Sequence, residues 1–229
     1  MKTPEEVERM RKGAEINVKA EKTVQESASP GVTEKELYEI FCSVLKKEQA
    51  DPAYPIIAAG TRAGVPLSPG WQPSERKLER GDVIRMDCDI IYRHYYSDIA
   101  CTSVIGEPSE KLKKYHAAAC AGNEEAVRAM KPGEKASTIF NIMMEKIKAV
   151  IPHYRRPHVG HAIGIECYNP LLFLGPLYNV KLEEGMTINV ESPYYELGWS
   201  GMNVERTILV TKKGAEDFAR GFTMKLYTL

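Results

Sequence analysis

Residues 83–102 constrain the fold most strongly, because they place carboxylates within two short strands that are otherwise largely apolar. The pattern predicts a β-hairpin that turns near Tyr92 and Arg93. With that turn, Asp87 and Asp98 lie directly opposite each other and point to the same face of the sheet. Two buried carboxylates this close repel each other unless a cation lies between them. An ordinary hairpin would bury one acid and leave the other in solvent, so the rest of the chain has to decide between a cation site and a plain hairpin.

Composition excludes several classes of function. The 229 residues suit one large domain or two small ones, and 31 basic residues balance 31 acidic ones. This balance gives no attraction to nucleic acid or to an anionic membrane. There is no apolar run of bilayer length and no signal-peptide core. The five scattered cysteines, without a CxxC pair, indicate reduced thiols in a cytoplasmic protein.

Helix signals precede the hairpin. A Thr-Pro-Glu-Glu capping box at residue 3 predicts a helix over 4–27. A second box at 33–36 predicts a helix that ends near residue 48. A short strand is expected over 54–60, followed by a surface loop over 61–80.

The order of these elements occurs twice. After the hairpin, Ser109 caps a helix expected to reach about Met130, a Pro-Gly break follows, and a shorter apolar face begins at Ile139. We therefore expect a single domain over 1–229 with two halves, at about 4–105 and 107–212. Chance similarity between amphipathic helices is the alternative.

The second half carries its own acidic hairpin. Glu191 and Glu205 are expected to pair around Gly198, as the two aspartates do in the first half. The segment 157–165 between the two hairpins contains His158 and His161, and one imidazole from it can complete the site. Four carboxylates and one histidine fit two divalent ions that share ligands, and this oxygen-rich set suits Mn, Fe(II), Co or Zn.

These residues resemble the pita-bread metallopeptidases, the family of methionine aminopeptidases, Xaa-Pro aminopeptidases and dipeptidases, and creatinase. The likeness rests on the eleven-residue step from Asp87 to Asp98, the Gly-His-x-Ile-Gly turn at His161, and the two glutamates that follow. The flanking residues match as well, from the Leu-Glu-Glu-Gly-Met lead-in at residue 182 to the Leu-Val-Thr tail at residue 209. The likeness covers nearly the whole chain from Pro4 onward. The amino-terminal domain of prolidases and creatinase has no counterpart here, so we expect either a catalytic domain alone or a naturally short form.

The resemblance implies an α+β pita-bread fold, with two pseudo-symmetric α/β halves and a curved antiparallel sheet covered by helices. It implies two divalent ions (Mn, Co, Fe or Zn) and a hydroxide bound between them that attacks a peptide bond near the N-terminus of a small substrate. It also points to a homodimer, which no stretch of the sequence demonstrates by itself. The ligands it implies are Asp87, Asp98, His161, Glu191 and Glu205.

The substrate-binding positions depart from the family pattern. Tyr168 replaces the second family histidine and Gly70 replaces an earlier one. Asn203 stands where the family has arginine, and Ala100 where it has threonine. The resemblance assigns Glu191 as proton shuttle as well as ligand; Tyr168 is then either a hydrogen-bond donor to the oxyanion or a plain pocket wall.

Two assignments depend on strand register. Asp89 has the same strand parity as Asp87, so an error in register would exchange them, although the eleven-residue spacing favours Asp87. His158 is expected to face away from the site if it lies on one strand with His161.

Three functions fit the sequence. The first is an Xaa-Pro dipeptidase or aminopeptidase. The second is a pita-bread hydrolase or lyase that acts on a small non-peptide compound, as creatinase does, and the missing histidines favour it. The third is a metal-free binding module, against which the five retained ligands argue.

Overall fold

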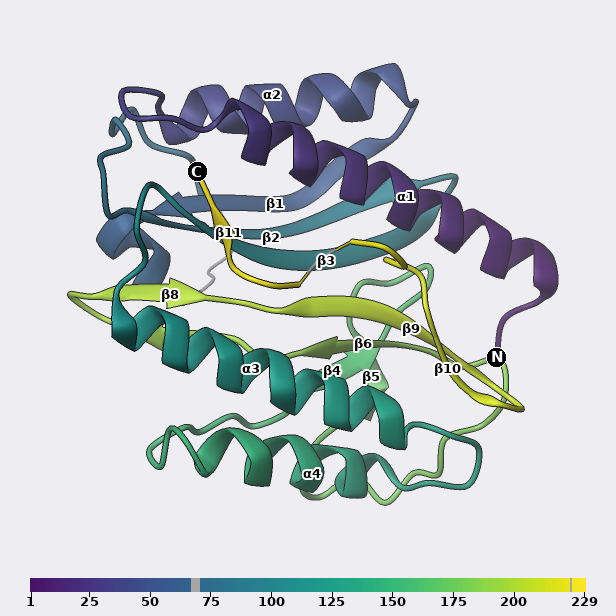
Figure 1. Ribbon diagram of the computed structural model, residues 1–229. Coiled ribbons are helices and arrows are strands. Elements are labelled where there is room, and N and C mark those ends of the chain that lie inside the picture. The colour runs from purple at the N-terminus through teal and green to yellow at the C-terminus, as the bar shows by residue number, and fades with distance from the viewer. Residues whose placement is uncertain (67–70, 223) are drawn as a thin grey trace.

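A single curved sheet forms the centre of the molecule, and its helices pack on one face (Figure 1). The computed structural model describes residues 1–66, 71–222 and 224–229. Within them the main path of the sheet runs β1-β2-β3-β9-β6-β4-β5, with every pair antiparallel; β10 adds to β9, and β11 adds to β3 in parallel. The strands are β1 (Asp51–Ala59), β2 (Val83–Tyr92), β3 (Tyr95–Val104), β4 (Gly160–Ala162), β5 (Asn169–Phe173), β6 (Thr187–Glu191), β9 (Glu205–Thr211), β10 (Gly214–Asp217) and β11 (Tyr227–Thr228).

The helices begin where the sequence predicts. In both capping boxes the threonine hydroxyl accepts from the backbone N–H of the glutamate three residues later, whose carboxylate accepts in return from the threonine N–H. Ser109 caps the third helix through the N–H of Leu112. The helices are α1 (Pro4–Ser27), α2 (Glu34–Lys47), α3 (Glu110–Ala129) and α4 (Ala136–Lys148), with one 3₁₀ turn, η1 (Gly60–Gly64).

Each long helix is fastened to the sheet by a fully buried asparagine. Asn17 of α1 donates to the carbonyl of Cys88 in β2 at 2.7 Å. Asn123 of α3 donates to the carbonyls of Val190 in β6 at 2.9 Å and Val204 beside β9 at 3.2 Å. The segments 4–105 and 107–212 therefore each place a long helix on the same face of the sheet. Their relation by an internal symmetry stays a prediction.

The turn of the acidic hairpin differs from the prediction. It lies at Arg93 and His94, whose φ angles of 47° and 73° give the left-handed geometry that suits a two-residue hairpin turn. Asp98 consequently pairs with Asp89, and Asp87 pairs with Ala100. The expectation that Asp87 and Asp98 lie directly opposite was wrong, because Arg-His carries none of the usual Asn-Gly turn signal. The shift leaves all three aspartates on the same face.

The second acidic hairpin pairs as expected. Glu191 lies opposite Glu205 in the β6–β9 ladder. Between these strands the chain forms a small separate hairpin, β7 (Tyr194–Glu196) and β8 (Ser200–Met202), with Gly198 at its tip. No helix in the described ranges has the length and apolar character needed to cross a membrane.

Candidate metal centre

Strand alternation sends the acidic side chains to the face of the sheet that the helices do not cover. In β2, Cys88 and Ile90 belong to the hydrophobic core, while Asp87 and Asp89 point the opposite way. In β3, Ile99 lies in the core and Asp98 faces the aspartates of β2. The period-two pattern thus gathers carboxylates on one side without requiring any unusual backbone.

The second half brings its residues to the same place through strand pairing. β4 pairs with β6, so that His161 lies opposite Asn189, two residues before Glu191. β9 meets β3 where Glu205 pairs with Ala100. The five predicted ligands therefore come from five strands that share one side of the sheet.

The side chains of these residues converge and are buried. His161 Nε2 lies 3.5 Å from Asp98 Oδ2, and ligand atoms of Asp98, His161 and Glu205 all lie within 4.8 Å of one another. Asn203 joins the two halves, because its Nδ2 donates to Glu205 Oε2 at 2.7 Å and to Asp87 Oδ2 at 3.3 Å. The exposed fractions of the five predicted ligands are 7% for Asp87, 2% for Asp98, 0% for His161, 6% for Glu191 and 3% for Glu205.

The residues present fit a divalent cation. Among the described residues, Asp98 Oδ1 and His161 Nε2 are buried without a hydrogen-bond partner. Burial, together with repulsion from neighbouring carboxylates, raises the pKa of Asp98 and of Glu205 well above the ordinary range. A buried acceptor without a partner, close to a free imidazole nitrogen, is what a bound ion would satisfy.

A buried arginine beside Asp87 was not anticipated. Arg85 is fully buried, and its Nη1 lies 3.1 Å from Asp87 Oδ2. The guanidinium also donates to the carbonyls of Ala63 and Val65 and stands over the ring of Tyr195, 4.9 Å from the ring centroid. Burial raises the pKa of Asp87, and the charge of Arg85 opposes this rise. Strand parity could have revealed the contact, since a charged residue two positions before Asp87 shares its face.

Glu191 is held by two basic side chains. Arg156 Nη2 donates to Glu191 Oε2 at 3.2 Å, and His158 Nδ1 lies 3.0 Å from Glu191 Oε1. Burial acts to raise the pKa of Glu191, but His158 and Arg156 outweigh it and hold that pKa below the usual value. The expectation that His158 faces away was wrong, because His158 precedes β4 and does not share its alternation.

Tyr168 lies at the edge of the group. Tyr168 lies in the segment between β4 and β5, and its side chain is 49% exposed. Its ring packs on the ring of His161, with the two centroids 4.1 Å apart. Burial, with the nearby carboxylates, raises the pKa of the Tyr168 hydroxyl, which therefore stays protonated. Gly70, the other position where the resemblance leads one to expect a histidine, lies outside the described residues.

A cleft of about 650 Å³ borders the acidic group. Two residues of the cleft wall connect it to the acidic group: Arg156 contacts Glu191, and the ring of Tyr195 lies under Arg85, which pairs with Asp87. The cleft is lined by Lys111, Tyr115, His153, Tyr154, Arg155, Arg156, Pro193, Tyr194, Tyr195, Glu196 and Leu197.

Gly160 sets the position of His161. A Cβ at Gly160, where φ is 155°, would lie 2.1 Å from the carbonyl oxygen of Asn189 in the neighbouring strand. We expect Gly160→Ala to push β4 from β6, lower the free energy of unfolding by about 1–3 kcal/mol, and weaken metal binding. Urea denaturation and a metal titration measure the two effects. Gly133→Ala is the control, since Gly133 also has a positive φ but has open space around it; equal losses in both variants would contradict the clash.

Comparison with known proteins decides the family. Residues 8–212 match the model of metallopeptidase family M24. The chain belongs to this family. An Xaa-Pro dipeptidase of Pyrococcus furiosus is 33% identical over 224 residues, which cover 96% of this chain and 63% of the relative. The chain thus spans less than two thirds of the length of that M24 protein.

Solved structures agree with the M24 assignment. The prolidase from Pyrococcus furiosus superposes with a TM-score of 0.89 at 32% identity, over 96% of this chain and 65% of that one. An X-Pro aminopeptidase from Thermotoga maritima superposes with a TM-score of 0.91 at 26% identity, over 100% of this chain and 64% of that one. The expected α+β pita-bread fold and the family resemblance are both confirmed.

Proposed function

We propose that this M24 protein is a metal-dependent peptidase of the Xaa-Pro dipeptidase or aminopeptidase type. The observation that carries the proposal is the convergence of ligand atoms of Asp98, His161 and Glu205 within 4.8 Å in a buried site, where Asp98 Oδ1 and His161 Nε2 have no hydrogen-bond partner among the described residues. Two similar proteins named Xaa-Pro dipeptidase and X-Pro aminopeptidase support the substrate class.

The proposed ligands of two divalent ions (Mn, Co, Fe or Zn) are the five converging residues. Divalent ions bound there would lower the pKa of a coordinated water and polarise the scissile carbonyl. The chain itself neutralises part of the acidic charge, through Arg85 at Asp87 and Arg156 at Glu191. The ligand set is Asp87, Asp98, His161, Glu191 and Glu205.

Two side chains are proposed to move or donate protons. Glu191, kept ionised by Arg156 and His158, accepts the proton of the attacking water and passes it to the leaving nitrogen. The hydroxyl of Tyr168, kept protonated beside His161, donates a hydrogen bond to the oxygen that becomes negative.

The adjoining cleft suits a small peptide. Its volume of about 650 Å³ lies in the usual range for small-ligand sites. Its aromatic side chains can pack against apolar residues or a proline ring, and Arg155 and Arg156 offer positive charge for a carboxylate. Cytoplasmic location and homodimer formation stay predictions.

A substrate panel tests the proposal. Protein freed of metal with a chelator is reloaded separately with Mn, Co, Fe or Zn and given Xaa-Pro dipeptides, peptides with N-terminal methionine, and guanidino compounds. We expect Xaa-Pro peptides to be cleaved only after reloading. Turnover of a guanidino compound without peptide cleavage would instead support a creatinase-like enzyme.

Metal loading is also expected to stabilise the fold. An ion at one hundred times its dissociation constant adds about 2.7 kcal/mol to the free energy of unfolding, because it binds only the folded site. Thermal or urea denaturation with and without chelator measures this gain. If none of the four metals binds or raises the free energy of unfolding, the metal-free binding module is favoured.

A further inference from the structure

The carboxylates that face each other directly in the acidic hairpin are Asp89 and Asp98. They form one cross-strand pair of the β2–β3 ladder, and their exposed fractions are only 8% and 2%. Burial raises the pKa of Asp89 well above its ordinary range, and repulsion from Asp98 and Asp87 adds to this rise. Arg85, which neutralises Asp87, makes no ion pair with Asp89 among the described contacts. Asp89 is thus a buried acid that the five-ligand centre does not explain.

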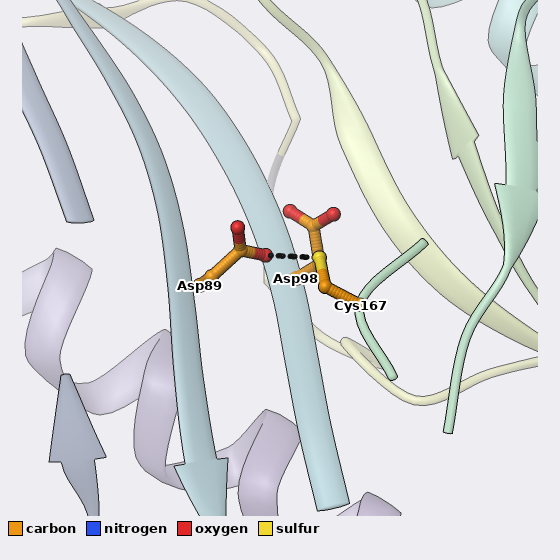
Figure 2. Close-up of side chains that lie close together, drawn as sticks. All are labelled: Asp89, Asp98 and Cys167. Carbon is orange, nitrogen blue, oxygen red and sulfur yellow. Dashed lines mark hydrogen bonds between the residues drawn. The ribbon is translucent and has the colours of Figure 1, made fainter. Parts of the chain in front are cut away.

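A buried thiol lies against this pair. Cys167 is 6% exposed, and its Sγ–H donates to Asp89 Oδ1 at 3.3 Å (Figure 2). Figure 2 also shows the Asp98 carboxylate beside the sulfur. Ligand atoms of the three residues all lie within 4.8 Å of one another, and Asp98 Oδ1 is buried with no hydrogen-bond partner in the described part of the chain.

We propose that Asp89, Asp98 and Cys167 form a second, mixed oxygen–sulfur ligand set that binds a thiophilic divalent ion of the zinc class. Asp98 also belongs to the group with His161 and Glu205, so its carboxylate is placed to bridge the two ligand sets. The presence of sulfur biases the centre toward Zn²⁺, Co²⁺ or Cd²⁺ and away from Mn²⁺ or Mg²⁺.

The geometry is close to what such an ion needs. Zinc binds thiolate at about 2.3 Å and carboxylate oxygen at about 2.1 Å, so neighbouring sulfur and oxygen ligands of a tetrahedron lie about 3.6 Å apart. The observed distance of 3.3 Å between Cys167 Sγ and Asp89 Oδ1 would need to lengthen only slightly to admit the ion. On binding, the S–H bond breaks, its proton leaves to solvent, and the sulfur forms a bond to the ion. The thiol hydrogen bond to Asp89 is replaced in the same step.

The competing explanation is a proton shared between Asp89 and Asp98, with Cys167 as an ordinary hydrogen-bond donor. The two explanations differ in whether sulfur contacts a bound ion. Co²⁺ separates them, because thiolate ligation produces a sulfur-to-cobalt charge-transfer band in the near ultraviolet, whereas oxygen and nitrogen ligands produce only the weaker visible bands.

The experiment is a Co²⁺ titration of reduced, metal-free protein, followed by absorption. We expect the charge-transfer band in the wild type and in the control Cys42→Ser, which alters a half-buried cysteine on helix α2. Cys167→Ser should lose this band and keep the visible bands of the five-ligand centre. Asp89→Asn should weaken Co²⁺ binding at the sulfur-containing set by at least about tenfold. Circular dichroism and thermal unfolding verify that each variant is folded.

The outcomes are distinct from those of the peptidase test. Visible bands without a charge-transfer band at saturating Co²⁺ would overturn the sulfur ligand set while leaving the five-ligand centre intact. A charge-transfer band that survives Cys167→Ser, or the absence of any Co²⁺ band, would also overturn it. A band lost only with Cys167 supports it even if no peptide is cleaved.

Discussion

Replacing Glu191 with glutamine is expected to lower kcat for peptide hydrolysis by roughly two to four orders of magnitude, the range for losing a positioned proton-transfer group. The amide keeps the volume of the side chain but cannot accept the proton of the attacking water. Arg156 and His158 would also lose the anion that they contact. KM should change less, because the loss falls on the chemical step.

The measurement is steady-state kinetics at equal metal content. Because Glu191 is also a proposed ligand, bound metal must be quantified in each sample before rates are compared. Glu184→Gln is the matched control, since Glu184 is exposed and its nearest ion-pair partner, Lys212, is 4.0 Å away. If the metal-loaded Glu191 variant has the kcat of this control, the shuttle assignment is wrong.

Replacing Arg85 with methionine is expected to lower the free energy of unfolding of the metal-free protein by about 3–5 kcal/mol, as when one partner of a buried ion pair is removed. Among the described residues, Asp87 would keep the amide of Asn203 as its one hydrogen-bond partner, in a site where 7% of its surface is exposed. The carbonyls of Ala63 and Val65 would lose a donor at the same time.

Urea denaturation in the presence of a chelator measures this loss. Arg76→Met is the control, because Arg76 also pairs with an aspartate, donating to Asp82 at 2.6 and 2.9 Å, but its side chain is 33% exposed. Adding Asp87→Asn to Arg85→Met should recover part of the stability, since it removes the unpaired charge. Loading Arg85→Met with Mn²⁺ should reduce the difference between its free energy of unfolding and that of the wild type. A loss no larger than that of Arg76→Met would show that Asp87 does not depend on Arg85.

The local signals in the sequence predicted the scaffold well. Thr3 and Thr33 mark the first turns of their helices because a capping box needs only residues three apart. The hairpin pattern predicted that Asp87 and Asp98 share one face, and this holds in spite of the wrong register because the pairing is shifted by two residues. The pairing of Glu191 with Glu205 followed from their spacing.

Contacts between distant parts of the chain could not be predicted in this way. The register of the acidic hairpin depends on positive φ angles at Arg93 and His94, and Arg-His is not one of the dipeptides that signal such a turn. The neighbours of Asp89 include Cys167, which lies 78 positions further along the chain. Such a pair becomes visible only once the segment after β4 lies beside β3, where the N–H of Tyr96 donates to the carbonyl of Gly164.

Glu205 and Ala100 form the only recorded pair between β3 and β9 in the described residues, so the joint between the two halves coincides with the acidic centre. An ion shared by ligands from both sides would therefore cross-link β3 and β9 at this pair, beside the hydrogen bonds that join Thr102 to Asn203 and Thr207 to Asp98. A substitution that removes a ligand in either half would therefore also weaken the association of the two halves.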